Sequence, residues 1–238
     1  ARPDLALQSI SKNIVWKDYK GISWVDTSSK EVWDYNLAIA KDALNRGFDE
    51  INFDYIRFAS DGNMADIRYP FYDSKIQTKR QVMNNFFKYL RENLPGAKLS
   101  ADLFGYTTLL QDDLGIGQNI DDAMPYFDYI APMVYPSHYN KGFNGHTNPA
   151  NFPYDVVYTS MLKAEQRLDA FNKSTTTIKM VESQFRPWLQ DFDLGADYDA
   201  VKIRAQIQAT YDAASTTEAG WMLWAPTNIY TKDALLSE

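Results

Sequence analysis

The chain has 238 residues and no cysteine, which excludes disulfides, thiolate nucleophiles and cysteine-ligated metal ions. A formal net charge of −7 without a basic patch argues against nucleic acid as a partner, and two histidines argue against a histidine-rich zinc site. Hydrophobic residues make up 45% of the chain, yet no apolar run approaches the ~18 residues of a membrane-spanning helix. We therefore expect one α/β domain over residues 1–238, with no cofactor, metal or membrane-inserted segment.

Helical and strand patterns alternate along the sequence. A helix is predicted over residues 30–46, because apolar residues recur at helical spacing, Ser28 and Glu31 are spaced as a capping box, and Gly47 follows the last turn. The remaining predicted elements are strands at 50–58, 99–105, 129–135, 177–185 and 220–225, and helices at 75–94, 120–126, 154–171 and 199–214.

Strands that alternate with helices predict a parallel sheet, either a doubly wound sheet or a (β/α)8 barrel. The carboxyl ends of the predicted strands distinguish the two. No glycine-rich phosphate-binding turn follows any strand, and the strand ends carry acids, amides and aromatic residues instead. This pattern favours a TIM barrel with a functional site at the carboxyl ends of its strands.

Two aspartates interrupt strands that are otherwise apolar. Alternation along residues 50–58 places Asp54 on one face with Asn52 and Ile56, and Asp102 occupies an equivalent position in the next strand. Adjacent parallel strands lie about 4.8 Å apart, so both carboxyl groups are expected to reach one ligand, within roughly 5–9.5 Å of each other. Such a pair suits acid and base roles in glycosidic hydrolysis. The alternative is that one or both are structural acids, paired with Arg57 or capping a loop.

Polar and aromatic residues near the other strand ends are candidates for substrate binding. Their rings suit stacking on sugars, and their amide, hydroxyl and charged groups suit sugar hydroxyls. The alternatives are core aromatics, a structural histidine, and a surface loop with one anchoring tryptophan. The candidates are Arg57, Tyr135, His138, Arg186, Trp188, Gln190 and Trp224.

Six ordered segments carry a resemblance to a known family: GFDEINFDYIRF, LSADLFGY, LGIGQ, YIAPMVYPSHY, RPWLQDF and GWMLW. Together they resemble the bacterial putative glycoside hydrolase domain, a family long regarded as of unknown function and distantly similar to chitinases. The resemblance runs from residue 1 to about residue 230. It implies a TIM barrel that acts on a carbohydrate, at an extracellular or cell-surface location; the residues themselves do not indicate a compartment.

The resemblance also assigns individual residues. The aspartate and arginine of the family's fourth strand fall on Asp54 and Arg57, and the aspartate of its fifth strand falls on Asp102. The Met-x-Tyr strand falls on Met133 and Tyr135, and the closing tryptophan falls on Trp224.

The chain departs from related families in two respects. Where chitinases have a catalytic glutamate, this chain has Ile56, so the chitinase mechanism and substrate do not transfer. Members of the family begin with three further strands, so we expect an N-terminally truncated barrel that holds strands four to eight, with open edges unless residues 1–25 cover them.

The sequence therefore predicts a glycoside hydrolase that cleaves a poly- or oligosaccharide with Asp54 and Asp102 as its catalytic carboxylates. The alternative function is a non-catalytic carbohydrate-binding barrel at the cell surface. Only the pair of carboxylates separates these hypotheses, because binding alone does not require two convergent acids.

Overall fold

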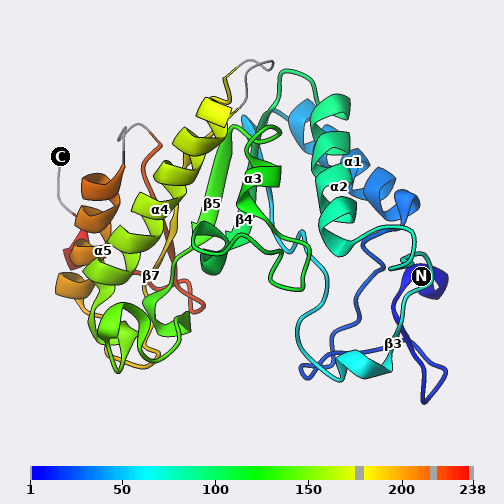
Figure 1. Ribbon diagram of the computed structural model, residues 1–238, viewed down its shortest axis with the longest axis horizontal. Helices are drawn as coiled ribbons and strands as arrows, with labels where there is room; N and C mark the ends of the chain where they lie inside the picture. The colour runs from blue at the N-terminus through cyan, green and yellow to red at the C-terminus, as the bar shows by residue number, and fades with distance from the viewer. Residues whose placement is uncertain (1, 175–179, 215–218, 236–238) are drawn as a thin grey trace.

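The computed structural model describes residues 2–174, 180–214 and 219–235, and its centre is a curled, parallel sheet (Figure 1). The strands follow one another in chain order, and every neighbouring pair is parallel. The predicted parallel sheet with sequential strand order is confirmed as a half-barrel. The strands in this sequential order are β2 (Glu50–Phe53), β4 (Lys98–Phe104), β5 (Tyr129–Met133), β7 (Trp188–Gln190) and β8 (Met222–Trp224), and a short sixth strand also pairs with β5.

Helices lie between successive strands, as the alternation predicts. In Figure 1, α1 and α2 stand together at one side of the sheet, and α4 and α5 stand together at the other. No helix within the described ranges is long and apolar enough to cross a membrane. The helices are α1 (Lys30–Asn45), α2 (Lys79–Asn93), α3 (Ile120–Ala123), α4 (Pro153–Ser174) and α5 (Ala200–Ala213).

The main core lies between the sheet and the helices. Phe87 of α2 and Met161 of α4 are fully buried against strand residues such as Leu99, Ile130 and Leu189. Burial of each such side chain contributes roughly 1.5–3 kcal/mol to folding. This packing fixes the strands that hold the site.

Helix α1 begins at Lys30 as predicted but with a different cap, and α2 begins later than the sequence predicts. At α1 the capping residue is Ser29, whose hydroxyl accepts a hydrogen bond from the Val32 amide, so the predicted box of Ser28 and Glu31 is wrong. At α2 the helix begins at Lys79 rather than at residue 75, because Thr78 and Gln81 form a reciprocal capping box there.

Four predicted strands are shorter than expected, and those at 50–58 and 177–185 differ most. Strand β2 ends at Phe53, and the backbone turns at Tyr55, which has a φ of 55°. Of the strand predicted at 177–185, residues 177–179 lie outside the described residues, and only β6 (Gln184–Phe185) is extended and paired with β5. Pro187 separates β6 from β7, because proline supplies no N–H to the ladder.

The N-terminal segment forms a small layer of its own. Strand β1 (Gln8–Ser9) pairs antiparallel with β3 (Ile67–Arg68), and Trp16 packs in the buried cluster beneath them. Strands β2 and β8 are the outer members of the main sheet, and no strand among the described residues covers their free edges. A closed barrel and a truncation therefore stay predictions.

Candidate active site

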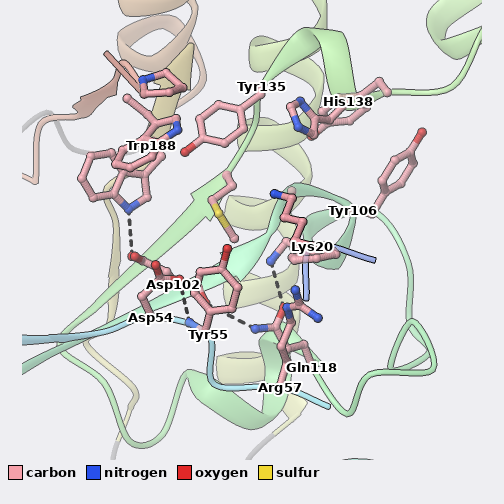
Figure 2. A pocket seen from close by; sticks show the side chains of 16 residues that line it. Lys20, Asp54, Tyr55, Arg57, Asp102, Tyr106, Gln118, Tyr135, His138 and Trp188 are labelled. Carbon is pink, nitrogen blue, oxygen red and sulfur yellow. Dashed lines mark hydrogen bonds between the residues drawn. The ribbon is translucent and has the colours of Figure 1, made fainter. Parts of the chain in front are cut away.

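A cavity of about 610 Å³ lies at the carboxyl ends of the sheet strands (Figure 2). It is the place where a TIM-barrel site is expected. Most of the predicted site residues line it: Asp54, Arg57, Asp102, Tyr135, His138, Trp188 and Trp224.

Asp102 is the most buried acid of the cavity, with 4% of its surface exposed. Both carboxylate oxygens accept hydrogen bonds, Oδ1 from Trp188 Nε1 at 2.8 Å and Oδ2 from Asn52 Nδ2 at 3.0 Å. Asn52 is held in turn by Ser100, whose hydroxyl donates to Asn52 Oδ1 at 2.7 Å. Burial raises the pKa of Asp102 to about 6, against the opposing effect of the two N–H donors.

Asp54 stands beside Asp102 at the end of the adjacent strand. The last paired residues of β2 and β4 are Phe53 and Ala101, so the two aspartates are the next residues on each side of the ladder. Asp54 is the more exposed of the two, and its Oδ1 accepts a hydrogen bond from the Tyr55 amide at 2.6 Å. Desolvation raises its pKa, and its charge in turn raises the pKa of Asp102. The two carboxyl groups are therefore electrostatically coupled.

Arg57 reaches the cavity because of the turn after β2. Its guanidinium lies over the rings of Trp24, Tyr55 and Phe104, with its carbon 4.8, 5.3 and 4.9 Å from their centroids. Only 7% of the residue is exposed. The alternative in which Arg57 forms an ion pair with an aspartate is not seen among the described residues.

Aromatic rings and one imidazole form the wall opposite Arg57. Trp188 and Trp224 meet edge to face, with ring centroids 6.2 Å apart. The Tyr135 hydroxyl points into the cavity in Figure 2, and burial raises the pKa of Tyr135, which keeps it protonated. Burial lowers the pKa of His138, whose Nδ1 is 3.0 Å from the Ser137 hydroxyl, so its imidazole is neutral at pH 7.

Two predicted binding residues do not line the cavity. Arg186 pairs with Glu50 at 3.0 Å, and its guanidinium lies 3.7 Å from the Tyr129 ring centroid, nearer the amino ends of the strands. Gln190 is fully buried, where its side chain accepts from the Ser137 amide and donates to the carbonyl of Phe192. Both hold the scaffold together in this structure.

The sequence reasoning missed several cavity residues that come from loops. Gln118 donates to the carbonyls of Ile56 and Asp102 and accepts from the Phe104 amide, so it ties the ends of β2 and β4 together. Its motif, LGIGQ, is one of the six segments that carry the family resemblance, but the sequence assigns no role to Gln118. The others are Lys20, Tyr55, Gly105, Tyr106, Tyr139 and Pro226, together with Phe104 at the end of β4; Met133, which the family resemblance assigns, lines the cavity as well.

Gly105 allows two walls of the cavity to approach each other. A Cβ at this position would lie 2.5 Å from the Met133 carbonyl oxygen and 2.7 Å from the Tyr139 hydroxyl, closer than atoms pack. The adjacent Tyr106 ring stacks on Tyr139 with centroids 4.9 Å apart. Residue 105 therefore has to be glycine for this packing.

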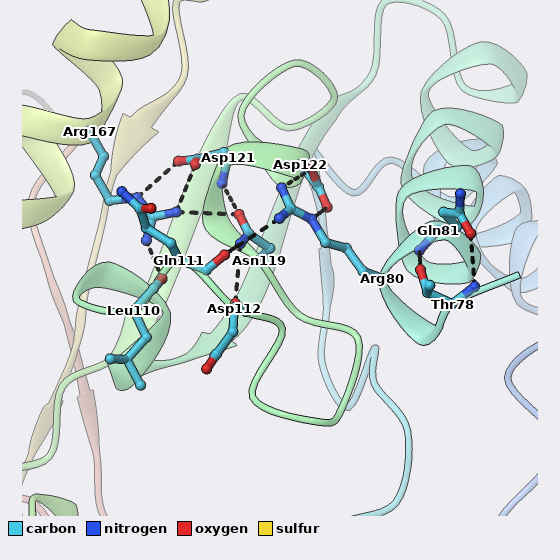
Figure 3. Close-up of polar contacts among 10 residues, drawn as sticks. All are labelled: Thr78, Arg80, Gln81, Leu110, Gln111, Asp112, Asn119, Asp121, Asp122 and Arg167. Atoms are coloured by element: carbon cyan, nitrogen blue, oxygen red, sulfur yellow. Dashed lines mark hydrogen bonds and ion pairs between the residues drawn. The ribbon is translucent and has the colours of Figure 1, made fainter. Parts of the chain in front are cut away.

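The loop that carries Tyr106 and Gln118 is fixed by two arginines (Figure 3). Arg167 of α4 pairs with Asp121 at 2.8 Å and donates to the carbonyls of Thr107 and Leu110, each at 2.6 Å. Arg80 of α2 forms two hydrogen bonds with Asp122, at 2.6 and 2.8 Å.

Within the same loop, Asn119 closes the network. Its amide donates to the carbonyls of Gln111 and Asp112 at 2.7 and 3.1 Å, and its oxygen caps α3 by accepting from the Asp121 amide (Figure 3). Helices on both sides thus hold this wall of the cavity.

The sequence comparison identifies the family. Residues 1–230 match a family model described as "Putative glycosyl hydrolase domain". The chain belongs to this family. The resemblance seen in the sequence motifs is thereby confirmed at the level of the family.

A solved glycoside hydrolase domain has a similar fold. The PgaB (BpsB) glycoside hydrolase domain from Bordetella bronchiseptica matches with a TM-score of 0.57 and 14% identity, over 93% of this chain and 64% of that one. A hypothetical protein from Ruminiclostridium thermocellum ATCC 27405 is 36% identical over 48% of this chain and 51% of that one, with a TM-score of 0.38. The chain thus spans less than two thirds of either structure. Comparison with curated proteins gives no significant match.

Proposed function

We propose that this domain hydrolyses glycosidic bonds of a poly- or oligosaccharide, with Asp54 and Asp102 as its catalytic residues. One observation carries the proposal: two electrostatically coupled carboxyl groups stand at the carboxyl ends of adjacent parallel strands and line one cavity. The sequential parallel order of five strands further supports a (β/α)8-type architecture.

The two acids lie in environments that suit different roles. Asp102 is buried, and a pKa of about 6 leaves a substantial protonated fraction near neutral pH, as a general acid requires. Asp54 is more exposed: desolvation raises its pKa, and the hydrogen bond from the Tyr55 amide and the charge of Arg57 oppose that rise. Asp102 therefore protonates the leaving oxygen, and Asp54 acts as the base or the nucleophile.

The remaining walls suit a sugar. Trp188 and Trp224 offer apolar ring surface for the faces of the pyranose, and the Tyr135 hydroxyl is a hydrogen-bond donor directed into the cavity. Trp188 also holds Asp102 through its indole N–H, so one residue links substrate binding to the orientation of the acid.

The test compares Asp54→Asn and Asp102→Asn with the wild type on a panel of polysaccharides, by release of reducing ends. Each variant keeps the side-chain shape but cannot ionise, so turnover is expected to fall by about 10²–10⁴-fold while saccharide binding persists. Asp42→Asn, on the exposed face of α1, is the matched control and should be unaffected.

A wild-type rate in either active-site variant would remove that residue from the mechanism. If the wild type binds saccharides but hydrolyses none of them, the domain is a carbohydrate-binding module instead.

A further inference from the structure

The guanidinium of Arg57 is buried at the wall of the cavity without a carboxylate partner among the described residues. Its Nη1 donates to the Phe58 carbonyl and to the Ser60 hydroxyl, each at 3.0 Å. No hydrogen bond of Nε or Nη2 is found within the described ranges. A guanidinium has five N–H donors, so most of the capacity of this group is unused.

Other arginines with low exposure in this protein do have a carboxylate. Arg167, with 14% side-chain exposure, pairs with Asp121, and Arg186, with 19%, pairs with Glu50. A buried charge without a partner is costly, and the cost is normally offset by an ion pair or by several hydrogen bonds. Arg57 is therefore a buried cation for which the described residues supply no counter-ion.

The acids near Arg57 do not supply that counter-ion. Asp54 and Asp61 both favour the charged guanidinium electrostatically, but neither forms an ion pair with it in the described residues. Asp61 is exposed and accepts a long contact from the Ser60 hydroxyl at 3.5 Å. The three aromatic rings around Arg57 hold the group in place without neutralising it.

A second cation belongs to the same part of the cavity. Lys20 enters it from the N-terminal segment, and in Figure 2 it lies with Arg57 and Gln118 on the side away from Trp188 and Asp102. Among the described residues, Lys20 has no ion pair. The cavity thus has a cationic end and an end that holds the two aspartates.

We infer that the domain takes an acidic saccharide, whose carboxylate or sulfate binds Arg57 and Lys20 while the neighbouring glycosidic bond lies at Asp54 and Asp102. The inference rests on the proposed function, because it assigns the substrate class of the same site. The planar guanidinium can hold an oxyanion through two parallel N–H bonds, and the exposed ammonium of Lys20 adds a weaker attraction. A neutral sugar would leave the buried charge uncompensated.

The test measures binding by calorimetry with Asp54→Asn, so that no probe is turned over. Two matched pairs serve as probes: an oligogalacturonate with its methyl ester, and a sulfated oligosaccharide with its desulfated parent. We expect one acidic member to bind at least about tenfold more tightly than its uncharged partner, and the pair that responds tells carboxylate from sulfate.

Further substitutions in the Asp54→Asn background locate the interaction. Arg57→Met retains an apolar side chain between the rings and should abolish the preference for the acid, whereas Lys20→Gln should reduce it by roughly two- to fivefold. Lys41→Gln removes the same charge from the exposed face of α1 and should leave the preference for the acidic probe unchanged. Should Arg57→Met fail to fold, the matched probes and Lys20→Gln still decide whether an acidic saccharide binds at the cationic end of the cavity.

The inference is overturned if no acidic probe binds more tightly than its uncharged partner, or if Arg57→Met keeps the preference. Hydrolysis of neutral glycans by the wild type would then leave the proposed function standing. Conversely, tight binding of an acid without turnover by the wild type would overturn the hydrolase and leave the anion site.

Discussion

Replacing Trp188 by phenylalanine removes the indole N–H that donates to Asp102 at 2.8 Å, while an aromatic ring remains against Trp224. The donor stabilises the ionised carboxylate, so its loss raises the pKa of Asp102. A hydrogen bond to a charged group contributes about 1.5–3 kcal/mol, which corresponds to roughly one to two pKa units. The pKa should therefore rise from about 6 toward roughly 7–8, while Asn52 still donates to the other oxygen.

The shift can be measured without a substrate, by following the carboxyl ¹³C resonance of Asp102 through a pH titration. In the active enzyme, the alkaline limb of kcat/KM should move to higher pH by the same amount, because it reports loss of the protonated acid. Trp224→Phe is the control, since no hydrogen bond joins Trp224 to Asp102 in the described residues. An unchanged or lowered Asp102 pKa in Trp188→Phe would refute the argument.

Two further predictions concern stability. Burial raises the pKa of Asp102 from 3.8 to about 6, so about 3 kcal/mol of stability is present below pH 3.8 and is lost as the pH rises through 6. Asp102→Asn lacks this loss, so its stability relative to the wild type should improve between pH 3.5 and 7.5, as measured by urea unfolding; a pH-independent difference would contradict this. Gly105→Ala should lower the unfolding free energy by about 1–3 kcal/mol, because its Cβ would meet the Met133 carbonyl, and an unchanged Tm would show that the backbone gives way freely.

The alternation of helices and strands was sufficient to predict the sheet and its order, because burial on both faces of a parallel strand leaves a pattern that local sequence carries. It was also sufficient to bring Asp54 and Asp102 into one cavity. Arg57 is an odd number of positions from Asp54, so the same alternation predicts that it lies on the opposite face of the strand. This prediction is wrong. Strand β2 ends at Phe53, and the positive φ at Tyr55 turns Arg57 into the cavity as well.

Residues brought in by loops could not be predicted in the same way. Gln118 and Lys20 reach the cavity through contacts distant in sequence, and neither lies in a periodic segment. Arg186 and Trp188 are two residues apart, so alternation places them on the same face of an extended segment but does not give their height relative to the cavity. A separation of two residues is about 6.6 Å, enough to leave Arg186 with Glu50, below the cavity, while Trp188 reaches Asp102.

The arginine network of the loop after β4 has a consequence for ligand recognition. Arg80 and Arg167 hold this loop from α2 and α4, two helices on opposite sides of it, so Tyr106 and Gln118 are already ordered when a ligand arrives. Ordering a free loop would cost about 1–2 kcal/mol per residue in conformational entropy at the moment of binding. In this protein the entropy cost of ordering the loop is met when the chain folds. This side of the cavity can therefore discriminate ligands by shape, because a ligand that does not fit can change the shape of the loop only at a cost in free energy.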